Sequence, residues 1–381
     1  MAGSVTSNRL RELAEFRAES GCAISLYLGF DPSTSATIPA AVTKINSLLD
    51  EAQKSTLVDR KQLTHEQKVG FQSDFDDIRR FLTEEFDRNG VRGIAIFAAG
   101  LDNFRSANGL IEAVPDDVRV GPDFYLTPLV PLLGRGEGAL VAVVGRERGN
   151  VYELRGGRLE EIADHTEEAP FRRTDQGGWS QARYQRHVDE LAERHLRTVA
   201  DELDRRVRAG ARQIIVFASE ENRAEFDDML SHEARKAIIG VGPDVPHATP
   251  TELLEHARPF LDQARLAEQT ETLARWQEEA GRNGRAASGW EQTLEAASDG
   301  RVELLLFQEG VNRQAYQCPS CTRAQTQDGA CPLDGTRLEA REDGIDLAVH
   351  QTLAHGGEVR SLARERRELG PVEGIAALLR Y

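Results

Sequence analysis

The spacing of apolar residues along the chain predicts a protein in which helices and strands alternate. Short continuous apolar runs are typical of buried strands, and such runs lie at 22–30, 91–98, 139–144, 213–218 and 301–307. Apolar residues three or four positions apart predict long helices at 64–88, 181–209 and 251–280. The pattern therefore indicates a mixed α/β (α+β) fold.

Shorter elements complete this pattern. Two runs of alternating apolar and polar residues, at 151–154 and 158–162, flank Gly156-Gly157 and predict a hairpin, because paired glycines favour a tight turn. Further helices are expected at 1–20, 38–52, 221–233, 290–297 and 346–353, and short strands at 237–240 and 358–362.

The length of the chain, 381 residues, suggests two or three domains. The order of the predicted elements gives an N-terminal α/β domain at 1–125, a central domain at 126–265 and a C-terminal α/β domain at 266–381. A cysteine-rich insertion is expected at 313–341, inside the third domain. No internal repeat or low-complexity tract is visible in the sequence.

The chain carries 63 acidic against 47 basic residues, which gives a formal net charge of −16. This balance argues against simple electrostatic adhesion to nucleic acid or to an anionic membrane. No apolar run reaches the roughly 18 residues that a membrane span needs, and the first residues lack the basic and apolar pattern of a signal segment. The composition therefore predicts a cytoplasmic protein.

One loop departs from this acidic background, between the predicted hairpin and the helix at 181–209. Gly177 and Gly178 allow backbone conformations that are barred to other residues, and Ser180 is expected to be the N-cap of the helix. Only one acid, Asp175, accompanies four arginines in and after the loop: Arg172, Arg173, Arg183 and Arg186. A flexible basic loop mounted on a long helix suits entry into crowded anionic surroundings, for which RNA is the obvious candidate.

Three of the four cysteines lie close together in the predicted insertion. Cys318-Pro-Ser-Cys321 is followed by Cys331-Pro-Leu-Asp334, a zinc-ribbon pattern in which aspartate replaces the last cysteine. Aspartate oxygen is an acceptable zinc ligand, and an ion held by all four side chains would be structural because no position remains for water. Two alternatives stay open: a ribbon that keeps its shape without metal, and a redox-active thiol pair.

The basic loop also carries a resemblance to a known family. Gly177-Gly178, Ser180 and the segment Arg183-Tyr184-Gln185-Arg186 match the loop of the archaeal and eukaryotic class-1 peptide chain release factors, in which Gly-Gly-Gln-Ser is followed by two residues and Arg-aromatic-x-Arg. The position of the family's catalytic glutamine holds Trp179, and Gln181 lies two residues further on.

The resemblance covers nearly the whole chain. Residues 266–307 follow the order of the family's third domain, the cysteine cluster falls where archaeal members carry a ribbon, and 374–381 is similar to the family's closing Gly-Ile-x-x-Ile-Leu-Arg-Tyr. The chain resembles a bacterial-type member of the archaeo-eukaryotic release factor superfamily, which includes Pelota and the hibernation factor Balon. The family's stop-codon motif, Asn-Ile-Lys-Ser, is absent, so stop-codon reading is not expected.

The resemblance implies a ribosomal partner and leaves two functional hypotheses for the loop. In the first, the protein occupies the ribosomal A site in hibernation or rescue. Trp179 would then stack on a base, and the four loop arginines would contact phosphates of ribosomal RNA or tRNA. An elongation-factor-type GTPase is a further partner that the resemblance suggests.

In the second hypothesis the protein is a peptidyl-tRNA hydrolase. Gly177 and Gly178 would let the loop enter the peptidyl-transferase centre, and Gln181 would replace the missing glutamine in orienting water against the ester. The structural alternative to both hypotheses is an ordinary surface turn.

Overall fold

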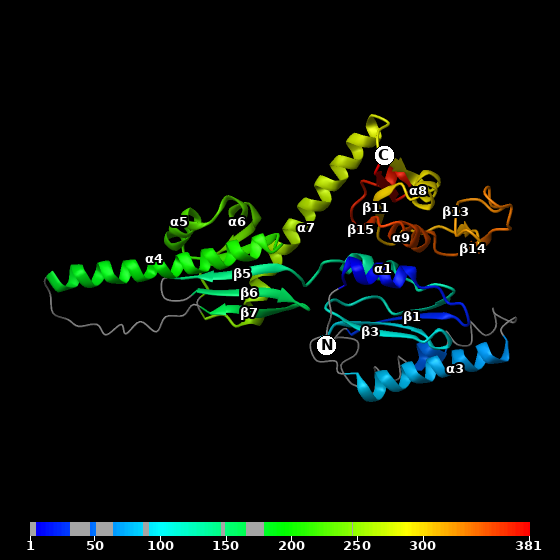
Figure 1. Cartoon of the computed structure of the whole chain (residues 1–381), viewed down its shortest axis with the longest axis horizontal. Helices are drawn as coiled ribbons and strands as arrows, with labels where there is room; N and C mark the ends of the chain where they lie inside the picture. The colour runs from blue at the N-terminus through cyan, green and yellow to red at the C-terminus, as the bar shows by residue number, and fades with distance from the viewer. Residues whose placement is uncertain are drawn as a thin grey trace. The chain divides into compact units, whose positions relative to one another are not determined.

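The computed structural model describes residues 5–30, 46–50, 64–86, 91–145, 149–164, 179–245 and 247–381, with the backbone alone for 179–192 (Figure 1). Contacts between residues group the chain into two compact units. Unit 1 combines the residues up to Arg135 with Gln269–Tyr381, and unit 2 holds Gly136–Glu268. The division into three domains at 125 and 265 stays a prediction.

The N-terminal part of unit 1 is an antiparallel sheet in the order β3-β2-β1-β4. Side chains alternate between the two faces of a strand, and β1 is buried along almost its whole length because helices cover both faces. Ile24 and Leu26 pack on the α3 side, whereas Tyr27 packs on the α1 side. The elements are α1 (Ser7–Glu15), β1 (Ala23–Gly29), α3 (His65–Arg80) with the π-helical turn η1 (Phe81–Glu85), β2 (Gly93–Ala99), β3 (Phe104–Leu110) and β4 (Asp117–Gly121).

The C-terminal part of unit 1 is a second sheet, in the order β10-β16-β11-β15. Strands β11 and β15 are parallel, while β16 runs antiparallel to both β10 and β11. Helices α8 and α9 cover one face, and the last turns of α7 cover the other, where Trp276 Nε1 donates to Ala287 O at 3.1 Å. The elements are α7 (Pro250–Gly281), β10 (Ala286–Ser288), α8 (Gly289–Ser298), β11 (Val302–Gln308), α9 (Gly344–Ala354), β15 (Glu358–Leu362) and β16 (Ile375–Leu379).

Between β11 and α9 the chain forms a small three-stranded sheet in the order β13-β12-β14. Its strands are β12 (Ala315–Gln317), β13 (Ala324–Gln325) and β14 (Glu339–Arg341), within the predicted insertion. The hydrophobic cluster of this ribbon contains Cys318, Cys331 and Leu338, with Tyr316 packed against them. So small a core supplies little burial by itself, and Ala315 and Ala324 of the ribbon belong to the larger core of unit 1.

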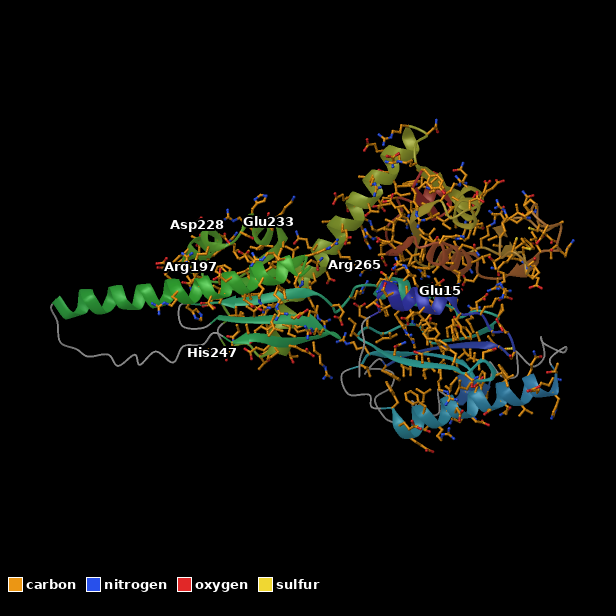
Figure 2. All side chains as sticks on the ribbon, in the orientation of Figure 1. Glu15, Arg197, Asp228, Glu233, His247 and Arg265 are labelled. Carbon is orange, nitrogen blue, oxygen red and sulfur yellow. The ribbon has the colours of Figure 1, made fainter. Side chains whose placement is uncertain are left out.

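Unit 2 is a five-stranded sheet in the order β7-β6-β5-β8-β9, covered by helices on both faces. Helices α4, α5 and α6 pack on one face, and the first half of α7 packs on the other. Figure 2 shows Arg197, Asp228 and Glu233 on α4, α5 and α6, and all three side chains are exposed. The remaining elements are β5 (Ala139–Val144), β6 (Gly149–Arg155), β7 (Arg158–Asp164), α4 (Trp179–Arg208), β8 (Gln213–Ala218), α5 (Glu220–Met229), α6 (His232–Ala237) and β9 (Ile238–Gly242).

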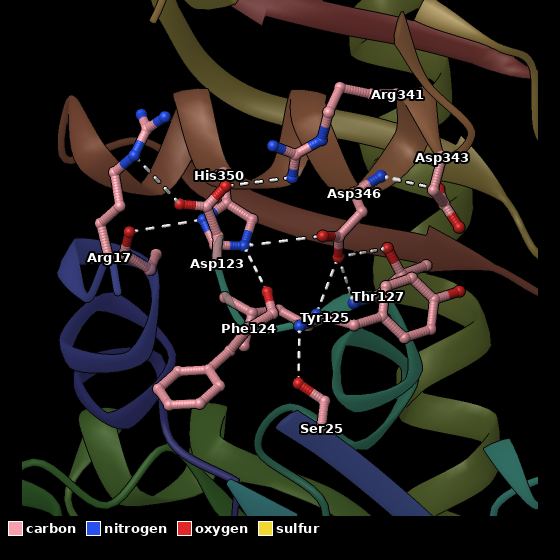
Figure 3. A network of polar contacts seen from close by, with 12 residues as sticks. Arg17, Ser25, Asp123, Phe124, Tyr125, Thr127, Arg341, Asp343, Asp346 and His350 are labelled. Carbon is pink, nitrogen blue, oxygen red and sulfur yellow. Dashed lines mark hydrogen bonds and ion pairs between the residues drawn. The ribbon is translucent and has the colours of Figure 1, made fainter. Parts of the chain in front are cut away.

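A buried carboxylate ties the two parts of unit 1 together. Asp346, in the first turn of α9, is only 6% exposed. Its Oδ1 accepts hydrogen bonds from Leu126 N at 2.7 Å, from Thr127 N at 2.9 Å and from Thr127 Oγ1 at 2.9 Å (Figure 3). Its Oδ2 lies 3.6 Å from His350 Nε2. The carboxylate therefore satisfies backbone donors that lie more than 200 residues away in sequence.

The imidazole of His350 extends this network toward α1. Its Nε2 lies 2.7 Å from Phe124 O, and its Nδ1 lies 3.3 Å from Ala14 O (Figure 3). Nearby, Arg341 Nη2 donates to Asp123 Oδ2 at 3.0 Å. The segment that follows β4 is thus held by α9 and by β14.

The closing motif has a structural explanation in Arg380. Its Nη2 donates to His355 O at 2.8 Å, and its Nη1 donates to Gly300 O at 3.4 Å. These carbonyls lie just beyond the C-terminal ends of α9 and α8, where unpaired carbonyl groups favour a cationic donor. Arg380 therefore caps two helices from the end of the second sheet.

The predicted α/β class is confirmed, as are most of the predicted elements, but some local features differ from the expectations. The helix expected at 221–233 is two helices, because Ser231 starts a new one: its Oγ accepts from Ala234 N at 3.1 Å and donates to Asp204 Oδ1 at 2.8 Å. Helix α4 begins at Trp179, so Ser180 lies in its first turn and is not its N-cap. Strand β10 was not expected.

Two further outcomes concern segments that the sequence analysis singled out. Of the helix expected at 38–52, residues 46–50 are helical and the rest lie outside the described residues. Among the described residues, no helix combines the length and the apolar character that crossing a membrane requires.

Candidate metal centre

The ribbon contains two turns that share one hydrogen-bond pattern. In the first turn, residues 318–323, Cys318 N donates to Arg323 O at 2.9 Å and Thr322 N donates to Cys318 O at 2.9 Å. In the second turn, residues 331–336, Cys331 N donates to Thr336 O at 2.8 Å and Gly335 N donates to Cys331 O at 2.9 Å. We call these turns the first and second knuckle.

The matching pattern makes Asp334 the structural counterpart of Cys321. Each is the fourth residue of its knuckle, and each accepts a hydrogen bond from the backbone two residues later, from Arg323 for Cys321 and from Thr336 N at 2.9 Å for Asp334. The aspartate therefore stands where a four-cysteine ribbon would carry its last cysteine. Sequence spacing predicted this substitution, and the backbone geometry supports it.

The side-chain atoms of the two knuckles converge. The ligand atoms of Cys318, Cys321, Cys331 and Asp334 all lie within 4.8 Å of one another. Cys321 Sγ lies 3.5 Å from Cys331 Sγ, and Cys318 Sγ lies 3.6 Å from Asp334 Oδ2. A tetrahedral ion with metal–sulfur bonds of about 2.3 Å needs ligand atoms separated by about 3.8 Å. The cluster can therefore hold a metal ion with little rearrangement.

The protonation of the cluster is set by backbone donors and by the crowding of the thiols. The Thr336 N–H and hydroxyl hold the pKa of Asp334 down at about 2. Burial disfavours the Cys318 thiolate, but the N–H groups of Cys321 and Ser320 lower its pKa. The Arg323 N–H favours the Cys321 thiolate, yet burial and the adjacent thiols raise the pKa of Cys321 to about 11. A cation would remove this conflict, because it stabilises every thiolate at once.

The first knuckle is anchored to the helices of unit 1. Gln351 Nε2, on α9, donates to Thr322 O at 2.9 Å, and Ala324 N donates to Ser298 Oγ, on α8, at 2.9 Å. Arg323 Nη1 also pairs with Asp299 Oδ1 at 2.6 Å. These supports were not predicted, because they join segments that are distant in sequence and carry no motif of their own.

The two knuckles differ at the residue that has a left-handed backbone. Thr322 has φ 62° and Gly335 has φ 74°, although L-residues other than glycine pay about 1–2 kcal/mol for this conformation. A Cβ at Gly335 would meet no atom within 4 Å, so the cost of a side chain there is conformational alone. The threonine is the less favourable of the two choices.

Exchange of residue types at these two positions is expected to change stability in opposite directions. Thr322→Gly should raise the free energy of unfolding of the ribbon by a few tenths to about 1 kcal/mol, and Gly335→Ala should lower it by about 1 kcal/mol. Urea-dependent proteolysis at Arg323 and Arg337 measures both effects. A Gly335→Ala protein as resistant as the parent would contradict the assigned backbone conformation.

The residues predicted for RNA contact and catalysis fall on or beside undescribed parts of the chain. Arg172, Arg173, Gly177 and Gly178 lie outside the described residues. Helix α4 carries the other four positions, whose side chains are likewise outside the described part: Trp179, Gln181, Arg183 and Arg186. For this set the structure adds one fact, namely that the backbone is helical from Trp179 onward.

Comparison with known proteins agrees with the sequence motifs. Residues 125–260 match the family described as "Bacterial archaeo-eukaryotic release factor family 10". Peptide chain release factor subunit 1 of Archaeoglobus fulgidus is 24% identical over 413 residues, which cover 98% of this chain and 96% of the relative. An uncharacterised protein of Mycobacterium tuberculosis is 26% identical over 304 residues, which cover 77% of this chain and 79% of the relative.

These similarities support a bacterial protein that resembles the archaeo-eukaryotic release factors, as its loop and closing motifs predicted. Among solved structures, a ribosome-bound archaeal Pelota is 14% identical in sequence, and the two superpose with a TM-score of 0.41. The match covers 100% of this chain and 95% of the Pelota chain.

Proposed function

We propose that this protein is a ribosome-binding translation factor that occupies the A site in hibernation or rescue and does not read stop codons. The observation that carries the proposal is similarity over 98% of the chain to an archaeal release factor, combined with the missing Asn-Ile-Lys-Ser motif. A ribosomal partner implies a cytoplasmic location, and an elongation-factor-type GTPase is the delivering partner that we propose.

The charge distribution supports contact with RNA through the segment 171–186, which ends in the first turns of α4. A chain with a net charge of −16 needs a local basic surface to approach phosphates. The four arginines of this segment, against the single Asp175, provide such a surface. Trp179 adds a stacking group, and base–aromatic stacking contributes about 1–3 kcal/mol per base. These features need no chemical step to hold the protein on a ribosome.

Hydrolysis of peptidyl-tRNA is the alternative that we favour less. Trp179 stands at the position of the family's catalytic glutamine. Gln181, the glutamine that would have to replace it, lies two residues later in the first turn of α4. A residue on a helical backbone is more constrained than one at the tip of a glycine loop. Occupancy without chemistry therefore agrees better with the positions of both residues.

Reversal of the loop charges is expected to weaken ribosome binding by at least about tenfold. The variant carries Arg172→Glu, Arg173→Glu, Arg183→Glu and Arg186→Glu. Because each lost phosphate contact reduces the dependence of affinity on salt by about one unit of slope, the slope of log Kd against log salt should fall by about 3–4. Co-sedimentation with 70S ribosomes at several salt concentrations measures both quantities.

A matched control distinguishes the effect of the four arginine positions from the effect of a change in net charge. Four exposed arginines further along α4 provide the same change in charge when they are replaced by glutamate: Arg194, Arg197, Arg205 and Arg208. This control should bind ribosomes within about twofold of the parent. Equal binding by the loop variant and the parent would overturn the proposal. A second assay measures peptide release from stalled ribosome–nascent-chain complexes. Release by the parent that is lost in Gln181→Ala would favour hydrolysis.

We also propose zinc as the ion of the metal centre, in a structural role. Thiolate ligands favour zinc, and three cysteines with one aspartate fill a tetrahedral coordination shell. The small core of the ribbon supports a structural role, since Cys318, Cys331 and Leu338 provide little burial. The zinc content of the purified protein tests this assignment.

A further inference from the structure

The three thiols of the ribbon differ in access and in spacing. Cys321 is exposed, whereas Cys318 and Cys331 are buried. The Sγ atoms of Cys321 and Cys331 lie 3.5 Å apart and belong to different knuckles. All four cysteines of the chain are reduced in the structure. An oxidant that reaches the cluster from solvent therefore meets Cys321 first, with Cys331 next to it.

We propose that the ribbon is a redox-sensitive site at which a hydroperoxide converts Cys321 and Cys331 into a reversible disulfide and releases the metal ion. The inference rests on the proposed zinc centre and is independent of ribosome binding. Formation of the bond requires the two sulfur atoms to approach by about 1.5 Å, from their present distance to the S–S length of about 2.05 Å.

The chemistry proceeds in two balanced steps. The Cys321 thiolate attacks one oxygen of the hydroperoxide, the O–O bond breaks, and the products are a sulfenic acid at Cys321 and an alcohol or water. The Cys331 thiolate then attacks the Cys321 sulfur and displaces hydroxide, which takes up a proton to become water. The hydroperoxide gains two electrons, and the two thiols lose them.

Loss of the ion follows from the geometry of what remains. After oxidation the ligands left are Cys318 and Asp334, whose Sγ and Oδ2 atoms lie 3.6 Å apart. Two ligands, one of them a carboxylate oxygen, do not complete a tetrahedral zinc shell. A thiol reductant restores both ligands, so the change is reversible.

Asp334 limits this oxidation to a single bond across the knuckles. With cysteine in place of the aspartate, the second sulfur pair could also oxidise, and Cys318 would acquire its own partner. The carboxylate cannot form a disulfide, so Cys318 stays reduced beside Asp334. The replacement that makes this ribbon unusual is therefore consistent with a switch that recovers readily.

Tryptic digestion provides a direct test, because cleavage after Arg313, Arg323 and Arg337 separates the knuckles. Cys318 and Cys321 fall in peptide 314–323, and Cys331 falls in peptide 324–337. The full-length protein is loaded with zinc, treated with hydrogen peroxide and alkylated before digestion. The proposal predicts that peroxide links the two peptides through a disulfide and that Cys318 is recovered in its alkylated form. Over the same time, one zinc ion per chain should be released and bind a chromogenic chelator.

Variants keep the test decisive. Cys321→Ser and Cys331→Ser should lose the link between the peptides, and dithiothreitol with zinc should restore the parent. A disulfide between Cys318 and Cys321, which stays within one peptide, would overturn the proposed pairing. A protein that takes up no zinc, or retains zinc after its peptides are linked, would overturn the release of metal.

Discussion

Asp346→Ala is expected to lower the free energy of unfolding of unit 1 by about 3–5 kcal/mol. The carboxylate is buried, it accepts three hydrogen bonds from Leu126 and Thr127, and it lies 3.6 Å from the His350 imidazole. Alanine would leave these donors without an acceptor, and each buried unsatisfied group costs about 1–3 kcal/mol. The expected loss is therefore a large fraction of the 5–15 kcal/mol of stability that is typical of proteins.

Hydrogen exchange localises this effect better than global unfolding does, because a chain with two units need not unfold in one step. The amides of Leu126 and Thr127, whose N–H groups lose their acceptor, should exchange much faster in Asp346→Ala. Asp346→Asn keeps an oxygen acceptor and should fall between the parent and the alanine variant. Glu358→Ala removes an exposed carboxylate of the same unit and should change stability by less than about 0.5 kcal/mol. Unchanged exchange at 126 and 127 would contradict the network.

Cys331→Ser is expected to reduce the zinc content from one ion per chain to almost none. Cys331 provides one of four converging ligand atoms, and a three-ligand remainder holds zinc far less tightly. Since Cys331 also belongs to the small hydrophobic cluster of the ribbon, loss of the ion should unfold this segment while the rest of unit 1 stays folded. Elemental mass spectrometry measures the zinc, and trypsin cleavage at Arg323 and Arg337 measures the unfolding.

Leu333→Ser is the matched control for the second knuckle. Leu333 is 70% exposed and contributes no ligand, so this variant should keep both its zinc and its resistance to trypsin. Parent protein that contains no zinc when it is purified without chelator, and yet resists trypsin in the ribbon, would show that the segment folds without metal.

Local sequence signals predicted the parts of this fold that local chemistry determines. The apolar run at 213–218 became β8, and Gly156-Gly157 became the turn of the β6–β7 hairpin, with φ 52° and 73°. The spacing of Cys318, Cys321, Cys331 and Asp334 was sufficient to predict that their ligand atoms converge. In each case a few neighbouring residues contain all of the information.

Features that depend on distant partners were not predictable in this way. From the sequence, Asp346 is indistinguishable from a solvent-exposed acid in the first turn of a helix. The tertiary fold places Leu126 N 2.7 Å from its carboxylate. The break between α5 and α6 depends on Asp204, which accepts from Ser231 across 27 residues. Strand β10 is three residues long and weakly apolar, and its pairing with β16 creates it.

The topology of the second sheet has a consequence for biosynthesis. Strand β16 is translated after its neighbours β10 and β11, yet it pairs with both of them. Until Ile375–Leu379 leaves the exit tunnel, β10 lacks the strand with which it pairs, and the apolar faces of α8 and β11 stay incompletely covered. Unit 2, by contrast, is continuous in sequence and can complete its sheet during elongation. A nascent chain whose translation stops shortly before β16 would therefore contain a folded unit 2 and an incomplete second sheet of unit 1. Its exposed apolar surface would make it a substrate for chaperones.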